Sequence, residues 1–416
     1  MNVNVNSEIG KLRAVITHTP GPEVENMSPI HTERSLYSDI LNLTVATKEY
    51  NQFHSILERF TKTYEVKDLL KDILKVDEPK KKLVTDICRH GDQLHLVENL
   101  LKMPLNKLTS SLIEGVLLDK DTLTSFLSKD RYALKPLHNF FFTRDPSVSC
   151  LNRVIISKMA NKVRERESII MEAIFRHHPE FTTSICNPLE HENTKSITLE
   201  GGDVIIARDD VMMIGIGART NTRGVDFVLE QFRKEKTRKN IIVQELPKKP
   251  ESFIHLDMVF TFLDVHECMV YEPLLLKPAP LQTVNITIDN GKVSIQRVKN
   301  IPEALKSLGF DLKAVKTGGQ NNVLMQEREQ WHSGANFFAV APGQVIGYSR
   351  NVYTLEALNN NGYEIIKASD IIKNKVDPSS YNKFVIAIEG SELSRGGGGA
   401  RCMTMPVNRE KVDWNS

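Results

Sequence analysis

Residues 203–246 read DVIIARDDVMMIGIGARTNTRGVDFVLEQFRKEKTRKNIIVQEL and contain four consecutive structural patterns. Two β-branched and apolar runs, 203–208 and 211–216, flank the Asp209-Asp210 dipeptide, which predicts a β-hairpin around a tight turn. Residues 225–234 then carry apolar side chains at 225, 228, 229 and 232, the spacing of one helix face. Residues 240–245 form a third strand-like run. The stretch therefore predicts a strand–strand–helix–strand unit.

The same order of patterns recurs elsewhere in the chain. Further copies are predicted over residues 12–66, 147–181, 286–315 and 336–367. Residues 67–134 differ, because they are rich in Leu, Lys and Asp and show helical but no strand patterns. Five ββαβ-like units interrupted by one helical insertion predict an α/β protein whose units form a closed, propeller-like ring around a central site. The alternative is an ordinary α/β sheet protein.

The composition is that of an ordinary globular protein, with 416 residues of which 40% are hydrophobic. A formal net charge of only +2 argues against nucleic acid as a partner. No apolar run is long enough to cross a membrane, and the N-terminus lacks the layout of a signal peptide. Five scattered cysteines without a CxxC pair predict neither a disulfide framework nor structural zinc, and favour a reducing, cytoplasmic setting.

Four segments from different units carry acids, a histidine and a cysteine. They are NFFFTRDP at 139–146, LEGGDV at 199–204, IHLDMV at 254–259 and SRGGGGARCMTMP at 394–406. Asp145 precedes a proline, which favours an extended backbone at the edge of a strand, although Asp-Pro is more often a simple turn. Glu200 precedes two glycines, which allow the backbone to approach another group closely, and the alternative is a plain loop.

The other two segments supply a base and a nucleophile. On a strand, His255 and Asp257 would project from one face, as an acid/base element or half of a metal site. Metal is the weaker option, because the sequence holds no HExxH motif and no histidine-rich cluster. Cys402 follows a glycine run and a guanidinium, Arg401, which are the ingredients of an activated nucleophile.

A Cys–His pair alone would suit a protease or an acyltransferase. Two or three additional carboxylates would not help there, because acyl substrates carry no positive charge. They are useful when the substrate is a cation, and a guanidinium matches bidentate carboxylates best. A thiolate could then attack the guanidinium carbon.

Together with SEIGKL at 7–12 and TPG at 19–21, the four segments resemble the arginine deiminase family, of the guanidino-group-modifying superfamily with the α/β-propeller (pentein) fold. The resemblance implies one catalytic domain over residues 1–416 with a helical subdomain inserted at about 67–134. It also implies a hydrolase that converts free L-arginine to L-citrulline and ammonia, the first step of arginine catabolism, without metal or cofactor. We also expect a homo-oligomer, a dimer or a tetramer.

The resemblance implies a role for each of the five reactive residues. Cys402 would be the nucleophile that forms a covalent amidino intermediate. His255 would be the general acid and base, oriented by Glu200. Asp145 and Asp257 would hold the guanidinium with its carbon toward sulfur.

It also implies how the amino-acid end of the substrate is bound. Arg164 and Arg219 would bind the α-carboxylate, with Asn139 nearby and Phe142 packed on the aliphatic stem. Gly396 would offer its carbonyl to the substrate amine.

One position departs from the family pattern, and three alternatives stay open. Gly397 stands where some members have an arginine, five residues before the nucleophile, which puts carboxylate affinity and loop order in question. The alternatives are an agmatine deiminase or another guanidine hydrolase, an amidinotransferase, and an inactive arginine-binding protein on the same scaffold.

Overall fold

The computed structural model describes residues 1–27, 39–190, 196–278, 280–319 and 322–414. Residues 203–246 form strands β8 (Val204–Arg208) and β9 (Val211–Ile216), helix α10 (Thr222–Arg233) and strand β10 (Lys239–Glu245). Strand β9 pairs antiparallel with β8 and parallel with β10. Helix α10 begins where the Asn221 side chain accepts the Gly224 N–H at 3.0 Å. The predicted unit is confirmed.

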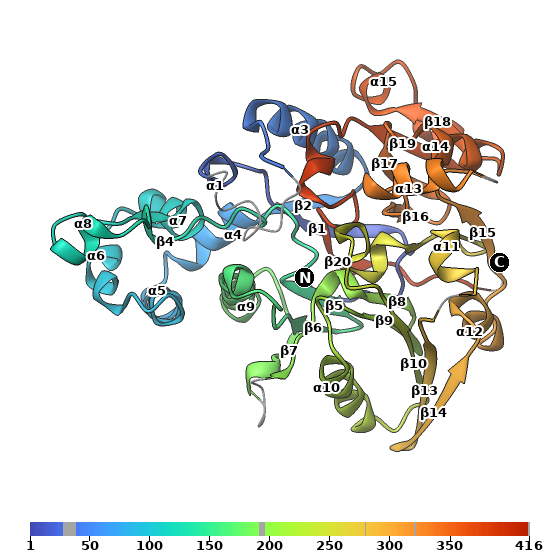
Figure 1. Ribbon diagram of the computed structural model, residues 1–416, viewed down its shortest axis with the longest axis horizontal. Coiled ribbons are helices and arrows are strands. Elements are labelled where there is room, and N and C mark those ends of the chain that lie inside the picture. Colours follow the sequence, from blue (N-terminus) through green and yellow to red (C-terminus); the bar gives the residue numbers. More distant parts are fainter. Residues whose placement is uncertain (28–38, 191–195, 279, 320–321, 415–416) are drawn as a thin grey trace.

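The same pairing recurs in four other sheets of the described chain. In each, a middle strand pairs antiparallel with one neighbour and parallel with the other. The four triplets are β20–β1–β2, β5–β6–β7, β11–β12–β15 and β16–β17–β19. Their bounds are β1 Leu12–Thr17, β2 Lys62–Glu65, β5 Ser147–Cys150, β6 Arg153–Ile156, β7 Ser184–Cys186, β11 Phe260–Asp264, β12 Glu267–Val270, β15 Lys313–Lys316, β16 Phe338–Ala341, β17 Gln344–Tyr348, β19 Phe384–Ile388 and β20 Met405–Arg409. The five-fold repeat predicted from the sequence is therefore present (Figure 1).

Two details of the predicted repeat are wrong. The hairpin β13 (Thr283–Asp289) and β14 (Lys292–Val298) does not start a unit of its own, because β13 pairs with β10 and extends that sheet. The third unit is instead built from β11, β12 and β15. In the last unit, β18 (Glu364–Lys367) lies outside β19 and does not contact β17. Apolar runs identify strands, but the pairing partner depends on contacts far apart in the sequence.

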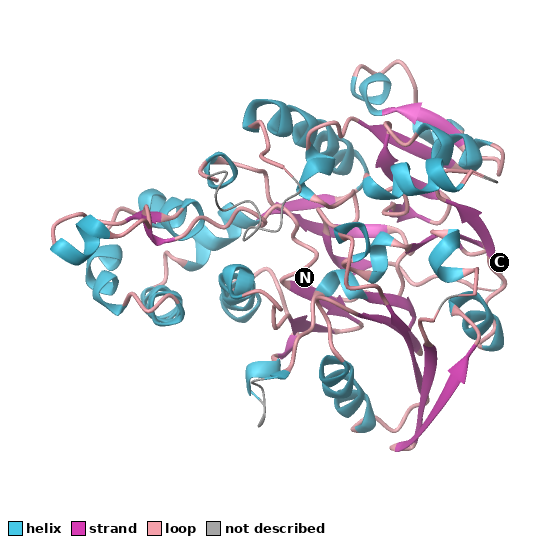
Figure 2. Cartoon of the chain, in the orientation of Figure 1, coloured by secondary structure: helices cyan, strands magenta, loops and turns pink. Residues whose placement is uncertain are grey.

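The helices that follow the hairpins lie at the periphery of the sheets (Figure 2). Their bounds are α1 Pro22–Glu25, α3 Leu43–Phe60, α9 Glu165–His177, α11 Glu272–Leu275, α12 Ile301–Ser307, α13 Val323–Trp331, α14 Val352–Asn359 and α15 Ala368–Ile372. Among the residues described, none of the helices has both the length and the apolar character needed to span a membrane.

A helical arm projects from one side of the sheets (Figure 1). It contains α4 Val66–Ile73, α5 Asp77–His90, α6 Val97–Leu101, α7 Leu105–Glu114 and α8 Leu123–Leu127, with a small strand pair, β3 Val116–Leu117 and β4 Tyr132–Leu134, that the sequence did not predict. Helices α4 and α5 pack on α9 of the core, with Leu70, Ile87 and Ile174 in one buried cluster. That residues 67–134 are a separate subdomain stays a prediction.

Candidate active site

Cys402 lies in the turn between the short helix η10 (Leu393–Gly396) and β20. Gly397 ends η10 with φ of 85°, a left-handed conformation that favours glycine. The Cys402 N–H donates to Asn336 Oδ1 at 3.3 Å, and its carbonyl accepts the Arg144 N–H at 3.1 Å. The side chain is only 3% exposed. Both backbone groups of Cys402 are thus fixed, and its sulfur faces the protein interior.

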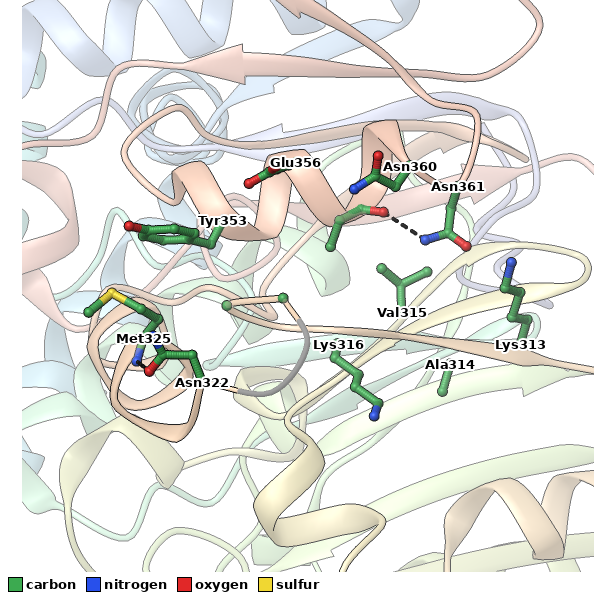
Figure 3. Close-up of a pocket in the computed structure, with 13 residues that line it drawn as sticks. Lys313, Ala314, Val315, Lys316, Asn322, Met325, Tyr353, Glu356, Asn360 and Asn361 are labelled. Carbon is green, nitrogen blue, oxygen red and sulfur yellow. Dashed lines mark hydrogen bonds between the residues drawn. The ribbon is translucent and has the colours of Figure 1, made fainter.

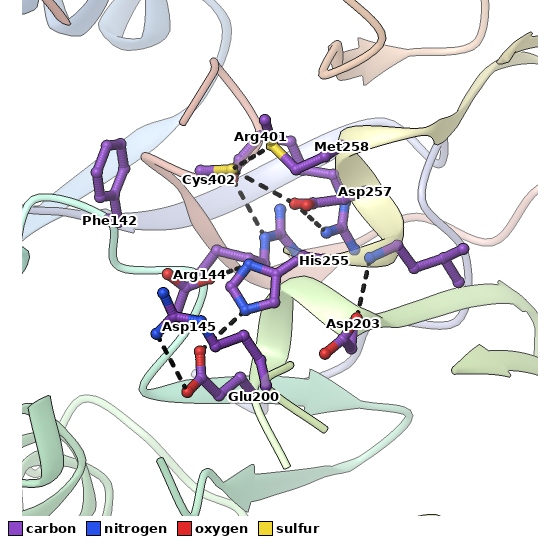
Figure 4. A network of polar contacts seen from close by, with 12 residues as sticks. Phe142, Arg144, Asp145, Glu200, Asp203, His255, Asp257, Met258, Arg401 and Cys402 are labelled. Carbon is purple, nitrogen blue, oxygen red and sulfur yellow. Dashed lines mark hydrogen bonds and ion pairs between the residues drawn. The ribbon is translucent and has the colours of Figure 1, made fainter. Parts of the chain in front are cut away.

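His255 and Asp257 do not lie on a strand, so that prediction is wrong. His255 has an extended backbone, with φ of −133°, and directly precedes the 3-10 helix η8 (Leu256–Met258). The tight turn sends the two side chains to different partners, His255 toward Glu200 and Asp257 toward Cys402 (Figure 4). Both residues still reach the site, but they serve opposite sides of it.

Carboxylates enclose the imidazole of His255. Its Nε2 lies 2.9 Å from Glu200 Oε2, and its Nδ1 lies 3.6 Å from Asp145 Oδ1. Burial alone would lower the pKa of His255, but Asp145, Glu200 and Asp203 together raise it to about 9. Burial would likewise raise the pKa of Glu200, but the hydrogen bond to His255 and the charge of Arg219 lower it to about 2. His255 and Glu200 therefore form an imidazolium–carboxylate pair at neutral pH.

The two glycines after Glu200 allow this close approach. A Cβ added at Gly202 would lie 2.5 Å from His255 Nδ1 and 2.9 Å from Asp145 Oδ1. A Cβ at Gly201 would clash with the carbonyl of Arg144. The close backbone approach predicted for this segment is confirmed.

The environment of Cys402 is different. Asp257 Oδ2 lies 3.6 Å from the sulfur and accepts a hydrogen bond from Arg401 Nη1 at 2.8 Å. The other donors of Arg401 turn away, and Nε and Nη2 each donate to Glu8 at 3.0 Å. Burial, together with the charges of Asp257 and Asp145, raises the pKa of the Cys402 thiol well above its ordinary value. The cysteine is therefore a neutral thiol at neutral pH.

Glu8 is the site residue to which the sequence analysis assigned no role. Burial would raise the pKa of Glu8, but the guanidinium of Arg401 lowers it to about 2, so the pair is ionised. The two residues are 393 positions apart in the sequence. No local pattern links them, and the available signal was the position of Glu8 within the SEIGKL motif at 7–12.

Asp145 and Asp257 each have one carboxylate oxygen that forms no hydrogen bond within the described part of the chain. Asp145 Oδ2 accepts from Arg164 Nη1 at 2.6 Å, and Asp257 Oδ2 accepts from Arg401 Nη1 at 2.8 Å. The remaining oxygen of each, Oδ1, is buried and has no hydrogen-bond partner among the described residues. Buried carboxylate oxygens without donors are costly, so a cation rich in N–H groups would be stabilised between them, next to Cys402.

The same residues include a possible metal-binding set. Asp145, Glu200 and His255 each offer a ligand atom, and these atoms lie within 4.8 Å of one another. However, Arg164 and Arg219 lie 2.6 Å and 3.9 Å from the two carboxylates and would repel a metal ion. This set suits a planar organic cation, which hydrogen bonds can orient, better than a metal.

Phe142, Gly396 and Asn139 lie together at one wall of the site. The Phe142 ring lies across the glycine run, and a Cβ added at Gly398 would be 2.5 Å from it. Gly396 lies in contact range of the same ring. The Asn139 carbonyl accepts a hydrogen bond from Arg164 Nη2 at 3.3 Å. The sequence-predicted residues of this wall are therefore neighbours in the structure.

Arg164 and Arg219, the two arginines predicted to bind the substrate's α-carboxylate, differ in how many of their N–H donors are already in use. Arg164 is occupied, since Nη1 donates to Asp145 while Nε and Nη2 donate to Glu167 at 3.1 Å and 2.8 Å. Arg219 Nη1 lies 3.9 Å from Glu200, and its guanidinium forms no hydrogen bond with any described residue. Arg219 can accept a new anion directly, whereas Arg164 must first release a carboxylate.

The side chains of Cys402 and His255 are buried. Cys402 is 3% exposed and His255 is 1% exposed. A cavity of about 580 Å³ lies elsewhere, between β15 and α14, with Lys313 and Tyr353 in its wall (Figure 3).

Known structures share the fold of this chain. An amidinotransferase from Microseira wollei matches with a TM-score of 0.55 at 15% identity, covering 99% of this chain and 98% of that chain. The N-terminal domain of a cyanobacterial arginine dihydrolase matches with a TM-score of 0.53 at 12% identity, covering 96% of this chain and 99% of that chain. These likenesses establish the α/β-propeller architecture.

Sequence relatives agree over nearly the whole length. Arginine deiminases from Oenococcus oeni and Borreliella afzelii are 30% and 32% identical to this chain, covering 99% of it and 98% of each relative. That of Bacillus cereus is 31% identical, covering 99% of both chains. Residues 34–409 match the sequence model of the family described as arginine deiminase. The chain belongs to the arginine deiminase family.

Proposed function

We propose that the chain hydrolyses free L-arginine to L-citrulline and ammonia through a covalent intermediate on Cys402. The observation that carries this proposal is a pair of buried carboxylate oxygens that form no hydrogen bond with the residues described, Oδ1 of Asp145 and of Asp257, whose charges act on the thiol. A guanidinium presents N–H groups in one plane and could donate a hydrogen bond to each of these two oxygens. Family membership and the names of the relatives support the same reaction.

Binding of the substrate activates the nucleophile in this mechanism. The two carboxylates keep the Cys402 thiol protonated when the site is empty. A guanidinium between Asp145 and Asp257 offsets their charge, so the thiol loses its proton to solvent. The thiolate then attacks the guanidinium carbon and forms a C–S bond, which gives a tetrahedral intermediate.

His255 transfers the protons of both half-reactions. Its imidazolium protonates one amino group of the intermediate, the C–N bond breaks, and ammonia leaves, with the amidino carbon still bonded to Cys402. The neutral imidazole then accepts a proton from water as that water attacks the same carbon. The C–S bond breaks, the hydroxyl proton leaves to solvent, and citrulline and the thiolate remain. Glu200 keeps the imidazole oriented at 2.9 Å.

The amino-acid end is bound at the wall that holds Phe142 and Gly396. Arg219 binds the α-carboxylate with its free donors, and Arg164 joins it when substrate displaces one of its present partners. Phe142 packs on the aliphatic stem, Asn139 lies beside it, and the Gly396 carbonyl accepts the α-amino group.

The test is product release without added metal from three substrates: L-arginine, agmatine, and an arginine within a peptide. We expect citrulline and ammonia from arginine only, unchanged by a chelator and abolished in Cys402→Ala. Comparable turnover of agmatine would contradict carboxylate recognition and favour a different guanidine hydrolase. Transfer of the amidino group to an added amine would favour an amidinotransferase.

A catalytically inactive binding protein makes a separate prediction. It would bind arginine, measured by calorimetry, without forming product from any of the three substrates. Assembly as a dimer or tetramer stays a prediction, which sedimentation would test.

A further inference from the structure

A second cavity lies where the helical arm meets the core. Its volume is about 260 Å³. Its wall is formed by the end of α5 with His90, the residues around β4 with Leu134 and Lys135, and the start of α9 with Val163 and Arg166. Lys162, the first residue of the 3-10 helix η3 (Lys162–Arg164) that precedes α9, completes the rim. Three separate segments of the chain therefore contribute to one pocket.

The wall of this cavity carries an excess of positive charge. Lys135, Lys162 and Arg166 are cationic, His90 adds an imidazole, and the lining contains no Asp or Glu. The nearest acids lie outside the lining but within ion-pair range, and Glu165 Oε2 lies 3.4 Å from His90 Nδ1. Lys135 Nζ lies 3.5 Å from Asp130, and Lys162 Nζ lies 3.8 Å from Asp92, with both lysine side chains more than half exposed.

Arg166 is the buried member of this group. Its side chain is only 5% exposed, and Nη2 donates to the carbonyl of Lys135. Its Nε and Nη1 form no hydrogen bond with any residue in the described part of the chain. The neighbouring acid, Glu167, is instead hydrogen-bonded to Arg164. Arg166 is thus a desolvated guanidinium with unused donors at the cavity wall, and burial lowers its pKa to about 10.

The larger cavity between β15 and α14 lacks this imbalance (Figure 3). There Lys316 Nζ already donates to Glu272 at 2.7 Å, and Glu356 contributes a carboxylate to the wall. The charged side chains of that wall are exposed or half-buried. Its charges are balanced, so the geometry does not select a ligand.

We propose that the 260 Å³ cavity binds a phosphate group, either free or carried by a small organic molecule. A planar guanidinium binds two oxygens of a tetrahedral oxyanion, and the two lysines supply the charge that a dianion needs. The apolar surface of Leu134 and Val163 accommodates the organic part of a monoester. The site is separate from the residues assigned to arginine hydrolysis.

The test is calorimetric titration of the full chain in chloride buffer with inorganic phosphate and, in a second arm, phenyl phosphate. We expect saturable binding of one equivalent that L-arginine does not displace. Tighter binding of phenyl phosphate would identify an organic phosphate as the ligand, and equal binding would identify free phosphate. Absence of heat from both probes into the millimolar range would overturn the proposal.

Substitutions in the cavity wall test whether phosphate binds at this site. Arg166→Gln should weaken phosphate binding by about tenfold or more, the loss expected for a charged hydrogen bond to an anion. Because Arg166 is buried, the double variant Lys135→Ala/Lys162→Ala gives a second test at exposed positions and should show a similar loss. Lys82→Ala, an exposed lysine on the same helix α5, is the control and should bind as the parent does. Unchanged affinity in the double variant would place the phosphate elsewhere and refute the site.

Discussion

The two sides of the active site hold their reactive groups in opposite ways. On one side, His255 is charged, because Asp145 and Glu200 stabilise its proton. On the other side, Cys402 is neutral, because burial and Asp257 oppose its ionisation and the nearest arginine, Arg401, is engaged with two carboxylates. The protein alone therefore does not form a thiolate–imidazolium pair. The missing positive charge is the one that a guanidinium substrate brings, which couples nucleophile activation to binding of the correct substrate.

The largest effects should come from the two aspartates with free oxygens. Asp257→Asn and Asp145→Asn should each lower kcat/KM for arginine by about 10²–10³-fold, because each removes charge stabilisation at the reacting carbon. Only Asp257→Asn should also lower the pKa of Cys402 strongly, since this carboxylate lies 3.6 Å from the sulfur. The pH dependence of thiol alkylation measures that pKa. Asp226→Asn, on the exposed face of α10, is the control. If the pKa of Cys402 were the same in Asp257→Asn and Asp145→Asn, Asp257 would have no special influence on the thiol, and the contrast between the two sides of the site would be wrong.

The next largest effects should come from the two arginines predicted to bind the substrate carboxylate, and these effects should differ between the two arginines. Arg219→Ala should lower kcat/KM for arginine by about 10²-fold, and by much less for a guanidine without a carboxylate. Arg164→Ala should reduce turnover of both compounds, because Arg164 also holds Asp145 and Glu167. Steady-state kinetics on both compounds measures this, with exposed Arg223→Ala as the control. Equal losses on the two compounds in Arg219→Ala would refute its role.

The pH profile tests the charged histidine. Because His255 must be protonated to release ammonia, kcat/KM should decline as pH rises through about 9, by about tenfold per pH unit above it. Glu200 raises the pKa of His255, so Glu200→Gln should shift this decline to lower pH. Measurement of kcat/KM against pH in both proteins gives the shift. A basic limb that stays in place in Glu200→Gln would show that another group titrates there.

The smallest effect on turnover should come from Glu8, whose main contribution is to stability. Glu8→Gln should lower turnover by about tenfold and the free energy of unfolding by about 3 kcal/mol, because it leaves Arg401 buried with one fewer carboxylate. The pKa of Glu8 is depressed from 4.5 to about 2, so its stabilisation is present above pH 4.5 and is lost as pH falls through 2.

Denaturant unfolding of the parent and of Glu8→Gln should therefore differ most above pH 4.5 and converge in acid. Glu410→Gln, which breaks an exposed pair with Arg13, is the matched control and should change stability little. A Glu8→Gln protein as stable as the parent at neutral pH would show that the buried pair contributes nothing net.

Sequence alone predicted the parts of this molecule that depend on local pattern. The hairpin, helix and returning strand of residues 204–245 follow from β-branched and apolar runs around a turn and from helical spacing, whereas the cap at Asn221 was not predicted. The placement of β13 did not, because its partner β10 is joined to it by neither a turn nor a motif. For the site, the sequence singled out Cys402 and His255 by residue type, but the strand predicted for His255 and Asp257 is instead an extended residue followed by a 3-10 helix.

The contacts that tune the site were less accessible. The carboxylate of Asp203 accepts the Leu256 N–H at 3.0 Å and so fixes the turn that carries Asp257. Burial raises the pKa of Asp203 to about 7. Asn336 holds the Cys402 loop by accepting the Arg401 N–H at 2.9 Å. These are single polar residues whose partners are 53 and 65 positions away, so only the folded chain reveals their function.

The pairing of β1 with β20 has a consequence for synthesis of the protein. Strand β20 follows Cys402 directly, and it completes its sheet only by pairing with a strand at residues 12–17. The ion pair between Glu8 and Arg401 likewise joins the N-terminal segment to the segment that precedes β20. Since domains begin to fold while the chain emerges from the ribosome, residues up to β20 must emerge before Cys402 can lie beside His255 in the assembled sheet. A nascent or truncated chain would thus hold an unassembled, inert site, and activity would report on complete folding.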